Sequence, residues 1–192
     1  MGYAPWQKVI AFIFSNKLQD GKWIAKYEKK FLEGIDPSGF AFSFGAGRMA
    51  LYAILEALNI GTGDEVILPA FTCEAVGYCL LYRGIKPVYA DIDPHTFNLD
   101  VTKLEPKISQ KTKAVIAQHT FGLACEMKAI LALSKKYSFF VIEDCALSQG
   151  AKYQGDPVGA LGDASFFSTD WTKVASTQWG GMAFTRNPAL SE

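Results

Sequence analysis

Two residues whose side chains could act together chemically each follow a short apolar run in this sequence. Asp144 comes directly after FFVIE (139–143), and Lys173 lies shortly after ASFFS (164–168). A lysine amine forms a Schiff base with an aldehyde, and a carboxylate can keep a pyridine nitrogen protonated so that the ring accepts electrons from a carbanion. Once free, the same amine can act as the base that moves a substrate proton. The pair predicts a binding site for pyridoxal 5'-phosphate.

A phosphate group needs an anion cradle, and the segment GAGRMAL (45–51) has a suitable composition. Gly45, Gly47 and Arg48 precede a helical pattern, so we expect backbone N–H groups and the positive end of a helix dipole to face a phosphate there. Ser168 would add a hydroxyl group. Glycine is also common in tight strand-to-helix turns, so a Gly-x-Gly turn by itself is weak support.

Each candidate also has an ordinary structural interpretation. A lysine chosen at random is usually solvated at the surface. An aspartate between a strand and a helix is commonly an N-cap, and taken alone Asp144 fits that role better than a cofactor role. His119, at the end of another apolar run, is either a histidine with internal hydrogen bonds or a contributor to the cofactor site. The combination of candidates, rather than any one of them, favours chemistry.

The overall composition is that of an ordinary globular protein. Lysine plus arginine and aspartate plus glutamate each number 19 among 192 residues, so no strong field favours nucleic acid or an anionic membrane as a partner. The hydrophobic fraction of 49% fits strands that are buried on both faces. The length is sufficient for one domain with a sizeable core.

The N-terminal region and the cysteines bear on the cellular compartment. The apolar stretch VIAFIF (9–14) is much shorter than the roughly 20 residues of a membrane-spanning helix, and no small-residue cleavage pattern follows it. We expect residues 1–22 to form an arm or a short amphipathic helix. Without an export signal the cysteines are expected to be reduced, which predicts a cytoplasmic protein. The sequence contains four of them, without the spacing of a metal site: Cys73, Cys79, Cys125 and Cys145.

Helix-like and strand-like segments alternate along the rest of the chain. A first helix is expected at 23–34, where the apolar spacing ends at a glycine. Further helices are expected at 48–60, 73–84, 100–108 and 125–137. The strand-like runs are AFSF (41–44), EVIL (65–68), PVYAD (87–91), KAVIAQ (113–118), FFVIE (139–143), ASFFS (164–168) and MAFT (182–185).

This alternation predicts an α/β fold with a seven-stranded, mostly parallel sheet and helices on both faces. The last two strands lack a helix between them, so we expect an antiparallel pairing or an edge position there. The stretch 151–163 is expected to be a turn-rich loop. In open α/β sheets, ligands gather at the carboxyl ends of the strands. Four segments are then expected to meet at one rim: 45–48, 69–73, 143–146 and 168–173.

As an ordered set, the motifs resemble the DegT/DnrJ/EryC1/StrS family of sugar aminotransferases, which are fold-type I pyridoxal phosphate enzymes. The resemblance implies that residues 23–192 are the large, cofactor-binding domain. Family members usually continue into a small C-terminal domain, so this sequence is expected to be a fragment, a split gene product or a truncated form. The similarity runs from about Trp23 to the last residue, through GAGRMAL, GTGDEVILPAFTC, PVYADIDPHTFNLD, TKAVIAQHTFG, FFVIEDCALSQGA, GALGDASFFS, WTK and WGGMAFT.

The resemblance also implies roles for single residues. Lys173 looks like the Schiff-base lysine of the family, and Asp144 looks like the partner of the pyridine nitrogen. Ser168, with Gly47 and Arg48, looks like the phosphate cradle.

Other positions are implied to surround the cofactor ring, and some depart from the family pattern. Ala146 looks like the small residue under one ring face. Cys73 stands where an aromatic residue often stacks on the ring, and Arg48 stands where many members have threonine. Leu147 replaces a residue that is often polar, and Trp179 replaces a glutamate before the Gly-Gly pair. These departures leave the chemistry of Lys173 intact and loosen the prediction of the substrate.

The resemblance implies a homodimeric enzyme of polysaccharide biosynthesis that transfers an amino group, usually from glutamate, to a nucleotide-linked keto sugar. A second hypothesis is a non-catalytic remnant that serves as a binding or regulatory module. A dehydratase or decarboxylase on the same scaffold is also open, although some dehydrating relatives have histidine where this chain has Lys173. A nicotinamide-binding Rossmann domain is disfavoured because no G-x-G-x-x-G follows the first strand.

Overall fold

The computed structural model describes residues 21–191, so nearly all of the predicted N-terminal arm lies outside the described residues. Seven strands form the main sheet, and each falls within two residues of its predicted bounds. They are β1 (Phe40–Phe44), β2 (Glu65–Pro69), β3 (Lys86–Ala90), β4 (Thr112–Gln118), β5 (Phe140–Asp144), β8 (Ala164–Ser168) and β9 (Gly181–Thr185).

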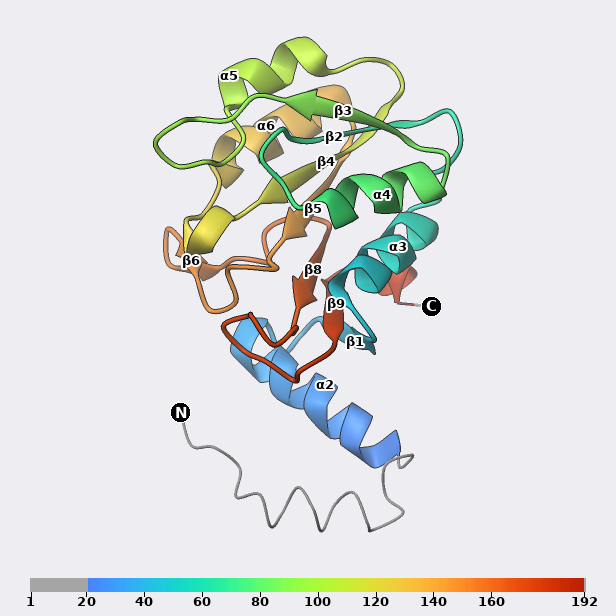
Figure 1. The fold of residues 1–192 in the computed structure, drawn as a ribbon, viewed down its shortest axis with the longest axis vertical. Coiled ribbons are helices and arrows are strands. Elements are labelled where there is room, and N and C mark those ends of the chain that lie inside the picture. The colour runs from blue at the N-terminus through green and yellow to red at the C-terminus, as the bar shows by residue number, and fades with distance from the viewer. Residues whose placement is uncertain (1–20, 192) are drawn as a thin grey trace.

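The strand order across the sheet is β1-β9-β8-β5-β4-β2-β3 (Figure 1). β2 pairs in parallel with β3 and β4, and the parallel pairing continues from β4 to β5 and from β5 to β8. Only β9 runs the other way, antiparallel to both β1 and β8. The predicted mostly parallel sheet is confirmed. For the last strand, the expected antiparallel pairing is confirmed. The alternative, an edge position, is wrong, because β9 lies between β1 and β8.

The helices are α2 (Gly21–Ile35), α3 (Gly47–Ala57), α4 (Glu74–Tyr82), α5 (Val101–Leu104) and α6 (Met127–Tyr137), with short 3-10 turns η1 (Glu105–Lys107), η2 (Thr120–Gly122) and η3 (Pro188–Leu190). The helix expected at 100–108 is interrupted, because Pro106 cannot donate the backbone hydrogen bond that would continue α5. α2 runs one residue past Gly34 and stops before Pro37. Among the described residues no helix is long and apolar enough to cross a membrane.

Alternation of side chains along the strands gives the sheet two buried faces. On one face, Val66, Leu68 and Ile116 pack against α3 and α4. On the other face, Ile67 and Val115 pack in a cluster with residues of α5 and α6. At the β1 and β9 end of this second face, α2 covers the sheet (Figure 1). Its Phe31 packs in a cluster with Phe167 of β8 and Phe184 of β9. Helices therefore cover both faces, as the alternating pattern predicts.

The predicted turn-rich loop at 151–163 contains a small hairpin that the sequence pattern did not predict. Its strands are β6 (Lys152–Tyr153) and β7 (Asp156–Pro157). The two residues that join them, Gln154 and Gly155, both have positive φ angles, as a tight hairpin turn requires. Two-residue strands are too short to produce a period-two pattern, so only the turn could be recognised.

The turn between β1 and α3 packs directly against the start of β9. A Cβ atom on Gly181 would lie 2.4 Å from the carbonyl carbon of Ala46 and 2.4 Å from the nitrogen of Gly47. Both atoms belong to the backbone and cannot move aside as a side chain would. Glycine at position 181 therefore allows the 45–47 turn to reach its position beside Ser168.

We expect Gly181→Ala to destabilise the protein by about 1–3 kcal/mol or more, because the added methyl group forces two backbone segments apart. Urea unfolding measures the change. Gly61→Ala is the matched control, since a Cβ atom there meets nothing within 4 Å. Equal unfolding midpoints for the two variants would contradict the close packing.

Candidate functional site

The carboxyl ends of β1, β2, β5 and β8 surround a pocket of about 280 Å³. The four segments expected at one rim all contribute to its lining. The pocket brings together all seven residues that the sequence singled out for the cofactor: Gly47, Arg48, Cys73, Asp144, Ala146, Ser168 and Lys173.

A second pocket of about 240 Å³ adjoins the first. Four residues line both pockets, namely Cys73, Asp144, Ala146 and Lys173. The second pocket also contains Phe71, Gln118, His119 and Phe121, none of which is among those seven residues. Lys173 is therefore accessible to two compartments, one bordered by the glycine turn and one bordered by the loops after β2 and β4.

The first compartment has the features of an anion site. α3 begins at Gly47, and its N-cap residue Ala46 offers no side-chain hydrogen bond. The N–H groups of Gly47 and Arg48 have no intrahelical acceptors, whereas the Met49 N–H already donates to the Ala46 carbonyl at 3.0 Å. The helix dipole adds positive potential there. Gly47 lies against the end of β8, where a Cβ atom would come within 3.2 Å of the Ser168 Cβ. The backbone turn, the Ser168 hydroxyl group and Arg48 thus border one space, which fits a phosphate group.

Asp144 lies at the end of β5 with 4% of its surface exposed. Its Oδ1 accepts a hydrogen bond of 2.9 Å from the Ala146 N–H. No helix follows it, so the N-cap interpretation is wrong. Burial raises the pKa of Asp144 to about 6, and the Ala146 N–H only partly offsets this effect. A buried carboxylate of this kind fits a cationic partner such as a protonated ring nitrogen.

Lys173 is half-buried on the loop 169–180, which joins β8 to β9. Hydrogen bonds close the base of this loop: Thr169 N–H donates to the Gly180 carbonyl at 2.9 Å, and Thr177 N–H donates to the Thr169 carbonyl at 2.9 Å. The hydroxyl groups of Thr169 and Thr177 lie 2.7 Å apart. Lys173 N–H donates to the Asp170 carbonyl at 2.9 Å. Lys173 therefore lies on a loop whose two ends are joined by hydrogen bonds.

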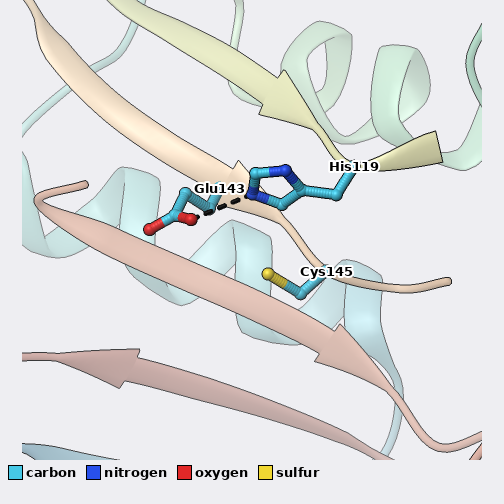
Figure 2. Close-up of side chains that lie close together, drawn as sticks. All are labelled: His119, Glu143 and Cys145. Carbon is cyan, nitrogen blue, oxygen red and sulfur yellow. Dashed lines mark hydrogen bonds and ion pairs between the residues drawn. The ribbon is translucent and has the colours of Figure 1, made fainter. Parts of the chain in front are cut away.

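Next to the pocket, the fully buried carboxylate of Glu143 accepts four hydrogen bonds. Oε1 accepts from the N–H groups of Leu161 and Gly162, each at 2.7 Å. Oε2 accepts from the Gly159 N–H at 2.7 Å and lies 2.9 Å from His119 Nε2 (Figure 2). The carboxylate therefore fastens the loop 159–162 and the end of β4 to β5.

The hydrogen bonds of His119 define its tautomer. The Cys125 N–H donates to His119 Nδ1 at 3.0 Å, so this nitrogen carries no proton. Nε2 must then carry the proton and donate it to Glu143. His119 is a neutral, fully buried histidine whose ring nitrogens are both satisfied within the protein. The sequence left open whether His119 is internally hydrogen-bonded or contributes to the cofactor site, and both ring nitrogens make internal hydrogen bonds.

His119, Glu143 and Cys145 also offer three metal-ligand atoms within 4.8 Å of one another (Figure 2). The ring nitrogens and both carboxylate oxygens are already engaged in hydrogen bonds. Burial raises the pKa of the Cys145 thiol well above its usual value, which disfavours the thiolate that binds metals. The cluster is a hydrogen-bonding centre.

Glu143 is the structural residue that sequence reasoning missed. The signal was present, because a glutamate inside the apolar run FFVIE must be paired if the run is a buried strand. Three of its four partners are backbone N–H groups of a loop 16 to 19 positions further along the chain. No residue type marks those groups in the sequence.

Comparison with known proteins places the fold and the motifs in one family. The sequence profile of the DegT/DnrJ/EryC1/StrS aminotransferase family matches residues 4–192. A GDP-perosamine synthase from Escherichia coli O157:H7 is 41% identical over 170 residues, which cover 88% of this chain and 46% of that protein.

Solved structures of aminotransferases have the same fold as this chain. An aminotransferase from Psychrobacter cryohalolentis superposes with a TM-score of 0.93 at 33% identity, over 99% of this chain and 49% of that one. Spr1654 from Streptococcus pneumoniae, a provisionally assigned sugar aminotransferase solved in its PLP-form, superposes with a TM-score of 0.90 at 28% identity, over 98% and 52% of the two chains. The chain spans about half the length of the relatives that it matches.

We expect Glu143→Gln to lower the free energy of unfolding by about 3 kcal/mol or more, because its amide NH₂ must face two N–H donors in either orientation. Urea unfolding at pH 7.5 measures the loss. Glu105→Gln is the control, since Glu105 is exposed and its ion pair with Lys136 lies at the surface, so this variant should lower the free energy of unfolding far less. Equal losses in both variants would show that the buried hydrogen bonds contribute little.

Asp144→Asn should make the cofactor-free protein more stable at pH 8. The folded-state pKa of Asp144, about 6, lies above the unfolded value of 3.8, so the unfolded state loses this proton first and stability falls as the pH rises from about 4 to about 6, with the full cost present above pH 6. The variant avoids this cost, which is on the order of 2–3 kcal/mol. The stability difference should close as the pH falls from 7 towards 4. Exposed Asp156→Asn controls for the loss of one negative charge, and a difference independent of pH would contradict the assignment.

Proposed function

The chain belongs to the DegT/DnrJ/EryC1/StrS aminotransferase family, and we propose that it is the cofactor-binding part of an aminotransferase that acts on a nucleotide-linked keto sugar. The observation that carries the proposal is the pair of adjoining pockets that share Lys173 and Asp144. Residues 23–192 would form the large domain of that enzyme. The relatedness to a GDP-perosamine synthase supports a sugar substrate carried on a nucleotide.

The cofactor of this family is pyridoxal 5'-phosphate, which supplies an electron sink for the carbanion left when a substrate loses a proton. The residues present fit its phosphate and ring. The uncapped N-terminus of α3, the Ser168 hydroxyl group and Arg48 would hold the phosphate. Asp144 would hold the ring nitrogen in its protonated form, at the buried end of the pocket.

The cofactor ring would lie between Ala146 and Cys73, because both residues line the two pockets. Ala146 is small enough to leave room for a flat ring. Cys73 is the exposed N-cap residue of α4, and its thiol gives less contact area than an aromatic side chain would.

Lys173 would perform the proton transfers. Its amine belongs to the lining of both compartments, so it would hold the cofactor before the substrate arrives and afterwards be free to act at the substrate carbon. The tied base of the loop 169–180 would keep the amine in place between these steps. An adjoining pocket of about 240 Å³ offers room for the substrate sugar.

The remaining parts of the proposal concern the whole enzyme. The amino donor would be glutamate, and the enzyme would be a cytoplasmic homodimer of polysaccharide biosynthesis. Because the chain spans about half the length of its relatives, residues outside it would complete the choice of sugar.

Pyridoxal phosphate added to the native chain should produce an absorbance band that borohydride fixes as a covalent label on Lys173. Absorbance spectroscopy and peptide mass mapping measure the band and the labelled residue. Lys173→Ala should lose both, because among residues 21–191 this is the only lysine in the lining of the pockets that contain Asp144.

Lys152→Ala is the control, since Lys152 is exposed on β6, and it should label as the wild type does. Absence of the label at Lys173 in the native chain would refute the enzyme hypothesis for this chain and favour the non-catalytic remnant. Labelling spread evenly over exposed lysines would have the same meaning.

A further inference from the structure

Three phenylalanines lie together on the loops that follow β2, β3 and β4. Phe71, Phe97 and Phe121 have 44%, 41% and 66% of their surfaces exposed. The ring centroids of Phe71 and Phe97 are 5.3 Å apart, and those of Phe71 and Phe121 are 6.3 Å apart. The rings are inclined at 49° and 64° rather than stacked face to face, and all three side chains remain partly exposed.

Two of these residues have an unfavourable backbone conformation. The φ angles of Phe97 and Phe121 are 59° and 53°, in the left-handed region that bulky side chains rarely adopt. Neither side chain is buried well enough to offset the strain. Strain of this kind persists where the surrounding structure fixes it, and it concentrates at ligand-binding positions.

A buried polar network holds the three loops in place. The Gln118 amide donates to the Phe71 carbonyl at 3.0 Å and to the Thr120 hydroxyl group at 2.9 Å. That hydroxyl group donates to the Phe97 carbonyl at 3.1 Å. The network thus binds the backbone of two phenylalanines directly.

Asn98 extends the same network to the residues around Phe121. Its Oδ1 accepts from the Thr120 N–H at 2.8 Å, and its amide donates to the Leu123 carbonyl at 3.0 Å. Asn98, Gln118 and Thr120 are all buried. Buried hydrogen bonds therefore fix the backbone around all three phenylalanines.

The position of the rings relates them to Lys173. Phe71 and Phe121 line the 240 Å³ pocket together with Lys173, whereas Phe97 lies next to them outside its lining. Both rings are exposed parts of the pocket lining, so a substrate whose sugar occupies this pocket can extend its remaining groups over them.

We propose that Phe71, Phe97 and Phe121 form an aromatic platform that binds the nucleobase of the nucleotide-linked substrate. The inference rests on the proposed function and adds the residues that hold the nucleotide end. Aromatic rings stack on any nucleobase, since every base has a flat π face. The exposure of the rings, their hydrogen-bonded support and the place of Phe71 and Phe121 in the lining of the lysine pocket all suit this role.

Calorimetric titration of the native chain with GDP, UDP and dTDP tests the platform, with pyrophosphate as the probe that lacks a base. At least one nucleotide should bind more tightly than pyrophosphate. Phe121→Leu keeps an apolar side chain but removes the flat face, so it should weaken nucleotide binding about 10-fold or more. Phe121→Trp should restore it. Tyr82→Leu is the control, because Tyr82 is 86% exposed on α4 and lies outside this pocket.

A second variant separates binding from folding. Phe121→Asn places a residue that tolerates positive φ at this position, so its unfolding midpoint should equal or exceed that of the wild type. Its nucleotide affinity should nevertheless fall as in Phe121→Leu. A purely structural role for the ring would lower the unfolding midpoint instead.

Three results would overturn the platform. Nucleotides that bind no better than pyrophosphate would exclude a base site, and unchanged affinity in Phe121→Leu would exclude the ring. If the wild type sediments as a dimer and Phe121→Leu sediments as a monomer with unchanged nucleotide affinity, a second copy of the chain covers these rings instead. Borohydride labelling of Lys173 is scored separately in every variant, so normal labelling without nucleotide binding refutes the platform and leaves the proposed function standing.

Discussion

The arrangement of the site depends on the buried carboxylate of Glu143. An ionised group without water is costly unless donors surround it, and four donors do so here. They come from the end of β4 and from the loop before β8, so the carboxylate ties both to β5. Side chains alternate along a strand. Glu143 therefore anchors the structure on one side of β5, while its neighbour Asp144 lines the pocket on the other.

Around this anchor, the protein keeps several unfavourable features at one rim of a well-packed sheet. Asp144 is a buried carboxylate with a raised pKa, and two phenylalanines have left-handed backbones. Elsewhere both faces of the sheet are filled by apolar clusters. Stability supplied by the core allows the rim to hold groups that a ligand, rather than folding, would satisfy.

Much of the fold could be predicted because its signals are local. Short apolar runs separated by helical patterns indicated seven strands, and all seven are present. The place of β9 between β1 and β8 could not be predicted, since strand order depends on contacts between distant segments. The interruption of the helix at 100–108 had a signal in Pro106 that the apolar pattern obscured. The β6–β7 hairpin was missed because two residues make no periodic pattern.

For the site, the sequence by itself determined which chemical groups are present and that they follow strand ends. Because carboxyl ends of parallel strands share one rim, it also predicted that Gly47, Asp144, Ser168 and Lys173 would meet, and one pocket contains them all. Only the tertiary structure decided how those groups are ionised and paired. The raised pKa of Asp144, the neutral tautomer of His119 and three of the four donors to Glu143 depend on burial and on backbone groups that carry no mark in the sequence.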